Sequence, residues 1–308
     1  VGTVAGWGET SSGTRAFRIR TPYAPEDMQN LGSLGGSTSM AYGLNDLDEV
    51  VGWSSRASSY YDRAFLYSGD TMIDLGVPIG DKSCARGINN DGYVVVHSWG
   101  KTTRWTIKGP VYTYYDHTYL YQRATRLGNI GNLGKTQTIA DGINEAGQVY
   151  GCALDAAGRQ QAFVFSLAEP IRPLGATCGL LWADKMNDSG MIVGWKNGAV
   201  YRLLDDSDPG EDIGSLGTTM YANDMNNDGT IVGSCRAAAY GYAYHGYVSD
   251  EFGIRNLNDL IHPDDIAALN GGSISTAYGI NNNGSIAASL SSASPQQGVV
   301  LVPVTETP

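Results

Sequence analysis

One pattern of hydrophobic and polar residues recurs along the chain and predicts short, paired β-strands. Each copy has an Ala, then a Gly followed by Ile, Leu or Met and an Asn, then two or three turn residues, and then a Val/Ile run that usually ends in Gly. Asn and Gly tolerate positive φ and close hairpins, so each copy predicts two antiparallel strands. A truncated copy, VGTVAGW, opens the chain, and we expect part of that repeat to have been removed. The six full copies begin at Ala41, Ala85, Ala140, Ala183, Ala222 and Ala277.

A third strand and a short fourth element follow each hairpin. The fourth element reads NLG, DLG, RLG, PLG, DIG or NLN. Successive repeat alanines are 44, 55, 43, 39 and 55 residues apart, which is the size of a four-stranded propeller blade. Such sheets must stack on their neighbours to bury both faces. The predicted third strands begin at Arg15, Arg63, Thr103, Gln161, Gly198, His245 and Gly298.

We therefore predict an all-β fold, a single β-propeller domain over 1–308 with about seven four-stranded blades. Counting first strands instead gives six, so six blades with a supplementary hairpin is the next alternative, followed by an open β-solenoid. The two long repeats predict insertions at 108–124 and 259–273, the second with a short helical turn that starts near Pro263.

The amino-acid composition limits the classes of function that this chain can have. The 41 glycines and only 17% charged residues fit many short strands joined by tight turns. The net charge of -11, with no stripe of Lys or Arg, excludes a nucleic-acid binder. No apolar run is long enough to span a bilayer, so we expect no membrane insertion. The four cysteines (Cys84, Cys152, Cys178 and Cys235) have no CxxC spacing, which leaves two disulfides or buried free thiols as alternatives.

One position of the repeat varies while its neighbours stay small. The first strand of a blade usually lies nearest the propeller axis, so this position is a natural place to bind a ligand. Asp141 and Asp184 occupy this position in neighbouring blades, and Arg86 occupies it one blade earlier. Two carboxylates near a guanidinium suit the active site of a glycoside hydrolase or a lyase. The other interpretation is a hydrogen-bonded ring that fixes blade spacing. The occupants of this position are Tyr42, Arg86, Asp141, Asp184, Asn223 and Tyr278.

A second equivalent position follows the Val/Ile run. Tryptophans there are expected to fill the space between blades. His97 replaces an aromatic residue at this position, which makes it either a candidate catalytic base or a hydrogen-bonded core histidine. The occupants are Trp7, Trp53, His97, Cys152, Trp195, Ser234 and Ser289.

Two further segments carry candidate chemistry. The insertion at 108–124 is rich in tyrosine, and its Tyr114, Tyr115 and His117 are candidates to bind a sugar or a protein, unless the segment is an extra hairpin that covers a sheet edge. The segment DDSDPGEDIG resembles half of a calcium loop but lacks its full spacing, so a solvated turn is the favoured interpretation and we expect no other cofactor. Its candidate ligands are Asp206, Asp208 and Asp212.

Several strings resemble a known family. NLGSLGGSTSMAYGLND, DRAFLYSGDTMIDLG, GINEAGQVYG and the closing AYGINNNGSIAAS are similar to HAF-type extracellular repeats. The resemblance implies a secreted or surface-exposed bacterial propeller and carries no catalytic residue with it. The chain departs from the pattern where the HAF histidine survives only at His245, and where Lys185 and Asp224 replace a glycine.

Two functions follow as expectations. The first is an extracellular binding or surface-scaffold propeller whose partner is a polysaccharide or a surface protein. The alternative is a carbohydrate-active enzyme, a glycosidase or polysaccharide lyase, with Asp141, Asp184, Arg86 or His97 at the mouth of the ring. No GxSxG, HExxH or phosphate-binding loop supports another chemistry.

Overall fold

The computed structural model describes residues 2–57, 59–174, 179–205, 207–236, 243–291 and 297–303. Contacts divide the chain into two compact units, 1–173 and 174–308, and each is described by itself. None of the helices among the described residues is long and apolar enough to cross a membrane.

The described residues of unit 1 form fifteen strands and one short 3-10 helix, η1 (Pro25–Asp27). The strands are β1 (Thr3–Thr10), β2 (Gly13–Arg20), β3 (Gln29–Asn30), β4 (Gly35–Leu44), β5 (Val50–Arg56), β6 (Ser59–Ser68), β7 (Thr71–Gly76), β8 (Lys82–Ile88), β9 (Tyr93–Thr106), β10 (Gly109–Gln122), β11 (Thr125–Asn129), β12 (Gly134–Ile143), β13 (Val149–Asp155), β14 (Gln160–Phe165) and β15 (Arg172–Pro173).

Unit 2 continues the same succession of strands. They are β16 (Trp182–Met186), β17 (Ile192–Lys196), β18 (Ala199–Leu203), β19 (Glu211–Asp212), β20 (Thr219–Met225), β21 (Ile231–Arg236), β22 (Tyr244–Asp250), β23 (Gly253–Asn256), β24 (Ile274–Ile280), β25 (Ile286–Leu290) and β26 (Gly298–Leu301). Two 3-10 helices, η3 (Leu257–Leu260) and η4 (Pro263–Leu269), precede β24. The second starts at Pro263, which confirms the predicted helical turn.

Sequential strands pair in antiparallel meanders. The orders are β1-β2-β3 and β4-β5-β6-β7, then β8 to β11 and β12 to β15, which one parallel pair between Asp116 and Gln137 joins into an eight-stranded sheet. Unit 2 has β16 to β19, β20 to β23 and β24-β25-β26. A four-stranded meander is the blade of a β-propeller, so the predicted all-β propeller class is confirmed. The number of seven blades in a closed ring stays a prediction.

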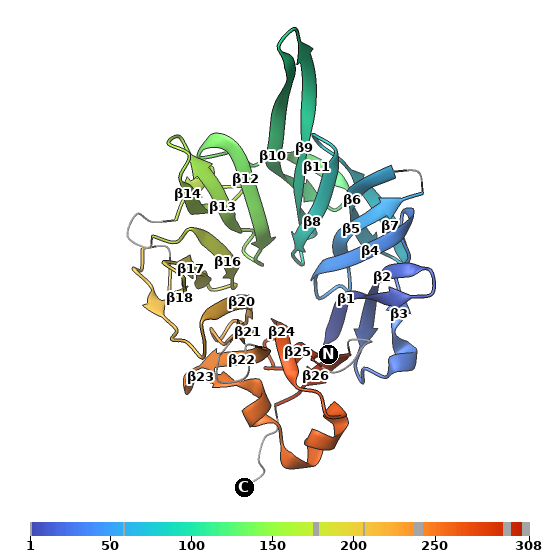
Figure 1. Cartoon of the computed structure of the whole chain (residues 1–308), viewed down its shortest axis with the longest axis vertical. Coiled ribbons are helices and arrows are strands. Elements are labelled where there is room, and N and C mark those ends of the chain that lie inside the picture. The colour runs from blue at the N-terminus through green and yellow to red at the C-terminus, as the bar shows by residue number, and fades with distance from the viewer. Residues whose placement is uncertain are drawn as a thin grey trace. The chain divides into compact units, whose positions relative to one another are not determined.

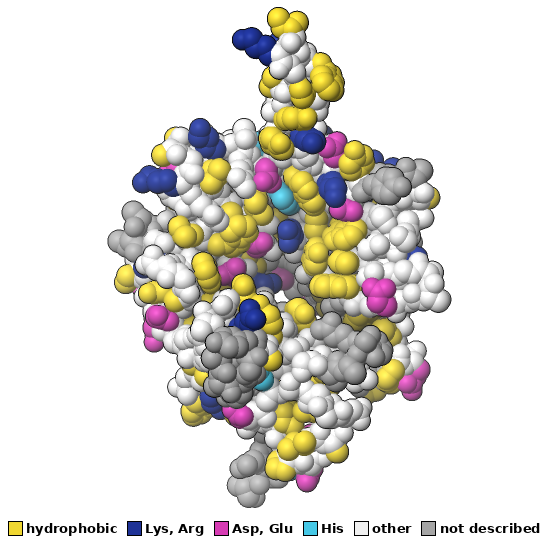
Figure 2. All heavy atoms as spheres, viewed as in Figure 1, with side chains coloured by type: hydrophobic (Ala, Val, Ile, Leu, Met, Phe, Trp, Pro, Cys, Tyr) yellow, Lys and Arg dark blue, Asp and Glu magenta, His cyan; other side chains and the backbone are white. Residues whose placement is uncertain are grey.

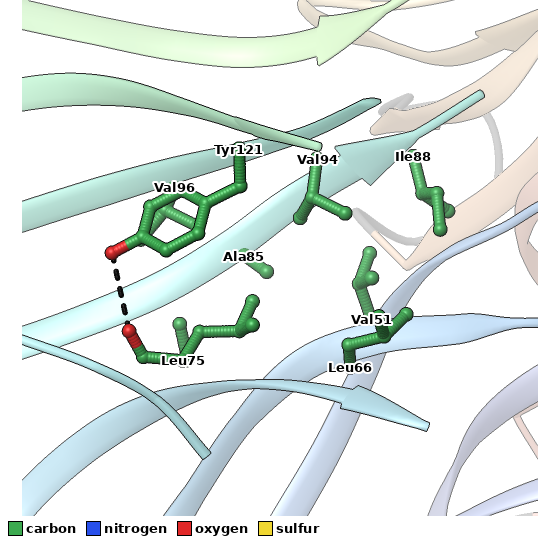
Figure 3. Close-up of a cluster of buried hydrophobic side chains, with 9 residues drawn as sticks. Val51, Leu66, Leu75, Ala85, Ile88, Val94, Val96 and Tyr121 are labelled. Atoms are coloured by element: carbon green, nitrogen blue, oxygen red, sulfur yellow. Dashed lines mark hydrogen bonds between the residues drawn. The ribbon is translucent and has the colours of Figure 1, made fainter. Parts of the chain in front are cut away.

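Neighbouring meanders pack face to face. In Figure 3, Val51, Leu66 and Leu75 lie against Ala85 and Val94 of the following meander. The hydroxyl of Tyr121 also donates to the carbonyl of Leu75 over 3.1 Å. Each fully buried Val or Leu contributes about 2 kcal/mol, so this interface is a main source of stability for unit 1.

A β-bulge lies at the same place in the first strand of most meanders. The register of β4 on β5 shifts between Ala41 and Gly43, and that of β8 on β9 between Ala85 and Gly87. The same shift follows the repeat alanine in β12, β16, β20 and β24. The residue left at each bulge is the variable residue of the repeat.

The glycine that ends the Val/Ile run is needed opposite this bulge. Gly52 pairs with Ala41, and a Cβ atom at Gly52 would lie 1.9 Å from the carbonyl oxygen of Met40. Gly233 stands in the same relation to the carbonyl of Tyr221. Any side chain here would push the two strands apart.

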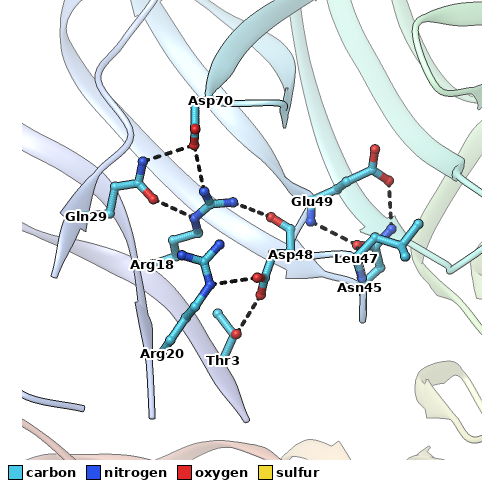
Figure 4. Close-up of polar contacts among 9 residues, drawn as sticks. All are labelled: Thr3, Arg18, Arg20, Gln29, Asn45, Leu47, Asp48, Glu49 and Asp70. Atoms are coloured by element: carbon cyan, nitrogen blue, oxygen red, sulfur yellow. Dashed lines mark hydrogen bonds and ion pairs between the residues drawn. The ribbon is translucent and has the colours of Figure 1, made fainter. Parts of the chain in front are cut away.

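Polar side chains join the first meander to the second (Figure 4). The buried Arg18 donates to Gln29, to the backbone carbonyl of Asp48 and to Asp70 at 2.7, 2.7 and 2.9 Å. Asp48 accepts from Thr3 at 2.6 Å and from Arg20 at 2.7 Å. Burial alone would raise the pKa of Asp48, but these hydrogen bonds and the arginine charges hold it below its ordinary value of 3.8.

The insertion at 108–124 differs from its predicted form. The segment from Thr103, expected as a third strand, instead belongs to β9, which runs on to Thr106. The chain turns at Ile107 and Lys108 and returns as β10, which is the third strand of this meander. The long β9–β10 hairpin projects from the sheets of its unit (Figure 1).

The structure decides between the two alternatives for the cysteines. Cys84 and Cys235 are buried free thiols, so the two-disulfide alternative is wrong. Cys152 is buried as well, and Cys178 lies outside the described residues.

Candidate functional site

Three of the predicted ligand-binding residues occupy bulges in unit 1. Tyr42, Arg86 and Asp141 lie at the bulges of β4, β8 and β12. A bulge turns a side chain out of the regular alternation of the strand, and such positions are common beside binding sites. The repeat therefore presents a different side chain from each meander on a constant backbone.

Aromatic rings surround Tyr42. Trp7 of β1 meets its ring edge-on, with centroids 5.8 Å apart. Trp53 of β5 donates from its indole Nε1 to the Tyr42 hydroxyl over 3.2 Å. Trp7 is 43% exposed and Trp195, its equivalent in unit 2, is 37% exposed, so the expectation that tryptophans here are buried between blades is wrong for these two.

Arg86 lies beside these rings without a charge partner. Its guanidinium carbon is 5.5 Å from the centroid of the Tyr42 ring. Its Nε atom is buried with no hydrogen-bond partner, and Arg86 forms no ion pair within the part of the chain that the structure describes. We call Trp7, Tyr42, Trp53 and Arg86 the aromatic-arginine surface. It offers flat rings next to a cation that lacks a counter-charge.

His97 lies in a more enclosed place in the same sheet as Arg86. Its Nε2 contacts a carboxylate oxygen of Asp116, its ring stacks on Trp99 with centroids 4.9 Å apart, and its side chain is 8% exposed. The Nδ1 atom is buried without a partner. These contacts agree with the interpretation of His97 as a hydrogen-bonded core histidine. The other interpretation, a catalytic base, stays a prediction.

Cys84 pairs with His97 in the register of β8 and β9, so a thiol adjoins the histidine. Burial raises the pKa of Cys84 to about 12, against a small lowering by Arg86. The thiol is therefore protonated at neutral pH and is no nucleophile. His117, on the next strand, has a pKa that burial lowers, partly offset by the Asp116 charge.

The remaining bulge positions lie in unit 2. Asp184 lies at the bulge of β16, in a different unit from Asp141, so their predicted convergence stays a prediction. Asn223 donates from Nδ2 to the carbonyl of Ala277 over 2.8 Å, which is the blade-fixing role of the alternative interpretation. Tyr278, at the bulge of β24, is half-exposed.

The three predicted hairpin ligands do not form one surface. Tyr114 and Tyr115 point to opposite faces of the hairpin because successive residues of a strand alternate. Tyr114 is exposed, whereas the Tyr115 hydroxyl is hydrogen-bonded to Thr102 at 3.0 Å. His117 lies at the root of the hairpin, beside Asp116.

Two of the three calcium candidates serve as turn residues. Asp208 accepts from the backbone of Leu204 and Gly210, each at 2.9 Å, and Asp212 accepts from Gly214 at 2.9 Å. Asp206 lies outside the described residues. Among the residues that are described, no three His, Cys, Asp or Glu side chains gather as a metal site. Calcium stays a prediction.

The sequence identified the variable positions that lie at the bulges, but it did not predict that Trp7 and Trp53 contact Tyr42. The signal was present, because Trp7 and Trp53 occupy one repeat position and Tyr42 another. The strand register and the packing of neighbouring meanders bring the two positions together, and neither is visible in the letters.

Comparisons with known proteins find distant structural similarities and no match in sequence. No protein-family model matches the chain, and no curated protein matches its sequence. The crystal structure of Porphyromonas gingivalis dipeptidyl peptidase 4 is similar at 12% identity and a TM-score of 0.47, covering 97% of this chain and 49% of that one. TolB from Acinetobacter baumannii is similar at 13% identity and a TM-score of 0.46, covering 97% and 64%.

The tricorn protease is similar at 11% identity and a TM-score of 0.38, covering 93% of this chain and 28% of that one. The chain thus spans about half of the peptidase and less than two thirds of TolB. Likenesses at these TM-scores and identities carry no argument about function.

Proposed function

We propose that this chain is a binding propeller that recognises a carbohydrate with an acidic group at the aromatic-arginine surface. The observation that carries the proposal is Arg86, a cation with no counter-charge among the described residues, held over the Tyr42 ring. No described carboxylate forms an ion pair with this guanidinium, and the carboxylate or sulfate of a ligand would supply the missing counter-charge.

The rings supply the second half of the binding chemistry. Trp7 and Tyr42 expose part of their faces, and aromatic faces pack against the CH groups of a sugar ring. The hydrogen bond from Trp53 and the guanidinium of Arg86 hold Tyr42 in place. A surface that is ordered before binding loses less entropy when the ligand arrives.

The resemblance to HAF-type repeats adds a location to this proposal. A secreted or surface-exposed bacterial protein meets acidic polysaccharides in its surroundings. A surface protein that presents an acidic side chain beside an apolar one is the other partner that fits the same groups.

Titration calorimetry with polygalacturonate and alginate, and with neutral dextran, tests the proposal. We expect binding to the acidic polymers only. Arg86→Gln should weaken the binding of the acidic polymers about tenfold, because one charged hydrogen bond is lost. Tyr42→Ala should weaken it about as much, because one stacked ring is lost. Trp7→Ala should weaken binding in the same way, and Trp195→Ala is its matched control, because Trp195 occupies the same repeat position in unit 2 and is 37% exposed against 43% for Trp7. Unchanged binding by Arg86→Gln would refute the proposal.

Incubating the protein with the same polysaccharides tests the alternative of a glycosidase or polysaccharide lyase. New reducing ends or unsaturated uronates would reveal catalysis, and Asp141→Asn, Asp184→Asn and His97→Gln would then identify the residues responsible. Binding without any product favours the proposal.

A further inference from the structure

The outer part of the β9–β10 hairpin stands alone. β8 pairs with β9 only as far as Trp99, and the parallel bridge to β12 is at Asp116. Beyond this pair, within the described residues, the strands pair only with each other, from Gly100 opposite Tyr115 to Thr106 opposite Gly109. At about 3.4 Å per residue the free ribbon extends on the order of 20 Å.

The end of this ribbon exposes apolar side chains. Trp105 is 76% exposed, Ile107 at the turn is fully exposed, and Val111 is half-exposed. Apolar side chains appear along the projecting hairpin in Figure 2. These residues contribute nothing to the cores of unit 1, so their exposure is not explained by folding.

The ribbon is also positively charged in an acidic protein. Residues 100–115 contain Lys101, Arg104 and Lys108 and no Asp or Glu, whereas the whole chain carries a net charge of -11. Lys101 lies 4.8 Å from the centroid of the Tyr112 ring. The ribbon is longer than the Debye length of about 8 Å in physiological salt, so the body's negative charge is largely screened at the tip.

We propose that the tip of the β9–β10 hairpin docks on the surface of an anionic lipid bilayer. Trp105, Ile107 and Val111 would enter the headgroup layer, while Arg104 and Lys108 contact lipid phosphates. Tyr112 and Tyr114, nearer the root, lie where aromatic rings favour the interface. This contact is peripheral, and it does not depend on the aromatic-arginine surface.

The composition of the ribbon favours lipid over polysaccharide. Residues 100–115 contain no Asp, Glu, Asn or Gln, so they lack the carboxylate and amide acceptors that bind sugar hydroxyls. An aliphatic side chain at the very tip has no flat face to stack on a sugar. Both features suit acyl chains and phosphates.

Sedimentation with phosphatidylcholine vesicles, with and without phosphatidylglycerol, tests the proposal on the full chain. We expect binding to the anionic vesicles, release at high salt, and quenching of tryptophan fluorescence by brominated lipid. Trp105→Ser combined with Ile107→Ser lowers the binding constant about tenfold or more, since two buried apolar side chains are lost. Arg104→Gln combined with Lys108→Gln lowers only the binding that depends on phosphatidylglycerol.

Phe252→Ser is the matched control, because Phe252 is 74% exposed at another hairpin turn with Arg255 over its ring. Circular dichroism checks that each variant is folded. Equal binding by wild type and the Trp105/Ile107 variant, or no binding by wild type, would overturn the proposal. Binding to polygalacturonate that the same variant loses, with no vesicle binding, would also overturn it and assign the hairpin to an acidic polysaccharide.

Discussion

The side-chain amide of Asn89 donates to the backbone carbonyl of Asn144, 55 residues further along the chain, over 3.2 Å. Asn45 donates to the carbonyl of Asn89 in the same way, at 3.1 Å. Unit 2 repeats the contact from Asn187 to Asn226. The repeat asparagine thus closes its own hairpin and joins that hairpin to the next meander.

Replacing Asn89 with Ala should lower the free energy of unfolding by about 2 kcal/mol. The buried carbonyl of Asn144 loses this donor, and the backbone N–H of Tyr93 loses the Asn89 oxygen that it reaches over 3.0 Å. Urea unfolding followed by circular dichroism measures the loss. Asn90→Ala is the control and should cost less, because its contacts with Asp46 are exposed. Equal losses would argue against the role of the buried amide.

A methyl group at Gly52 should destabilise the protein by about 3 kcal/mol. The added Cβ atom would collide with the carbonyl of Met40 across the bulge. Gly8→Ala is the matched control in unit 1, since nothing lies within 4 Å of its added atom. Thermal unfolding of both variants distinguishes a steric cost from a general effect of losing glycine. A Gly52→Ala variant as stable as Gly8→Ala contradicts the prediction.

Acid should weaken the junction around Asp48. Its folded pKa lies below the ordinary value of 3.8, so the carboxylate stabilises the fold above that value, and the contribution disappears as pH falls through the folded pKa. We expect wild type to be more stable than Asp48→Asn at pH 6, and this difference to shrink as the pH falls below 3.8 and through the lowered folded pKa. Urea unfolding across this range measures it. A gap that stays constant with pH would show that the charge of Asp48 is unimportant.

Cys84 should resist alkylation in the folded protein. Its pKa of about 12 keeps the thiol protonated at pH 8, and the side chain is buried. Iodoacetamide treatment followed by peptide mass spectrometry should show labelling of Cys84 only after denaturation. Rapid labelling of the native protein would instead mean that His97 and Arg86 activate the thiol.

The repeat predicted the meanders because the pairing of sequential strands is local. A hairpin depends on its own turn residues and on the alternation of its two strands, and both are present within each copy. The long hairpin formed by β9 and β10 was not predicted in this way. TRWTI has the length and alternation of a third strand, but the chain keeps it in β9 because the turn comes later, at Ile107 and Lys108.

The candidate site was predictable in position but not in composition. The variable residues between the repeat Ala and Gly identified Tyr42 and Arg86, because a single differing position among similar copies is visible in the letters. The tertiary structure alone decided that Arg86 lies over the Tyr42 ring, that Trp7 and Trp53 border that ring, and that His97 is enclosed by Asp116 and Trp99. Those contacts join side chains from different strands and meanders, and they depend on bulges, register and packing that no single stretch of sequence determines.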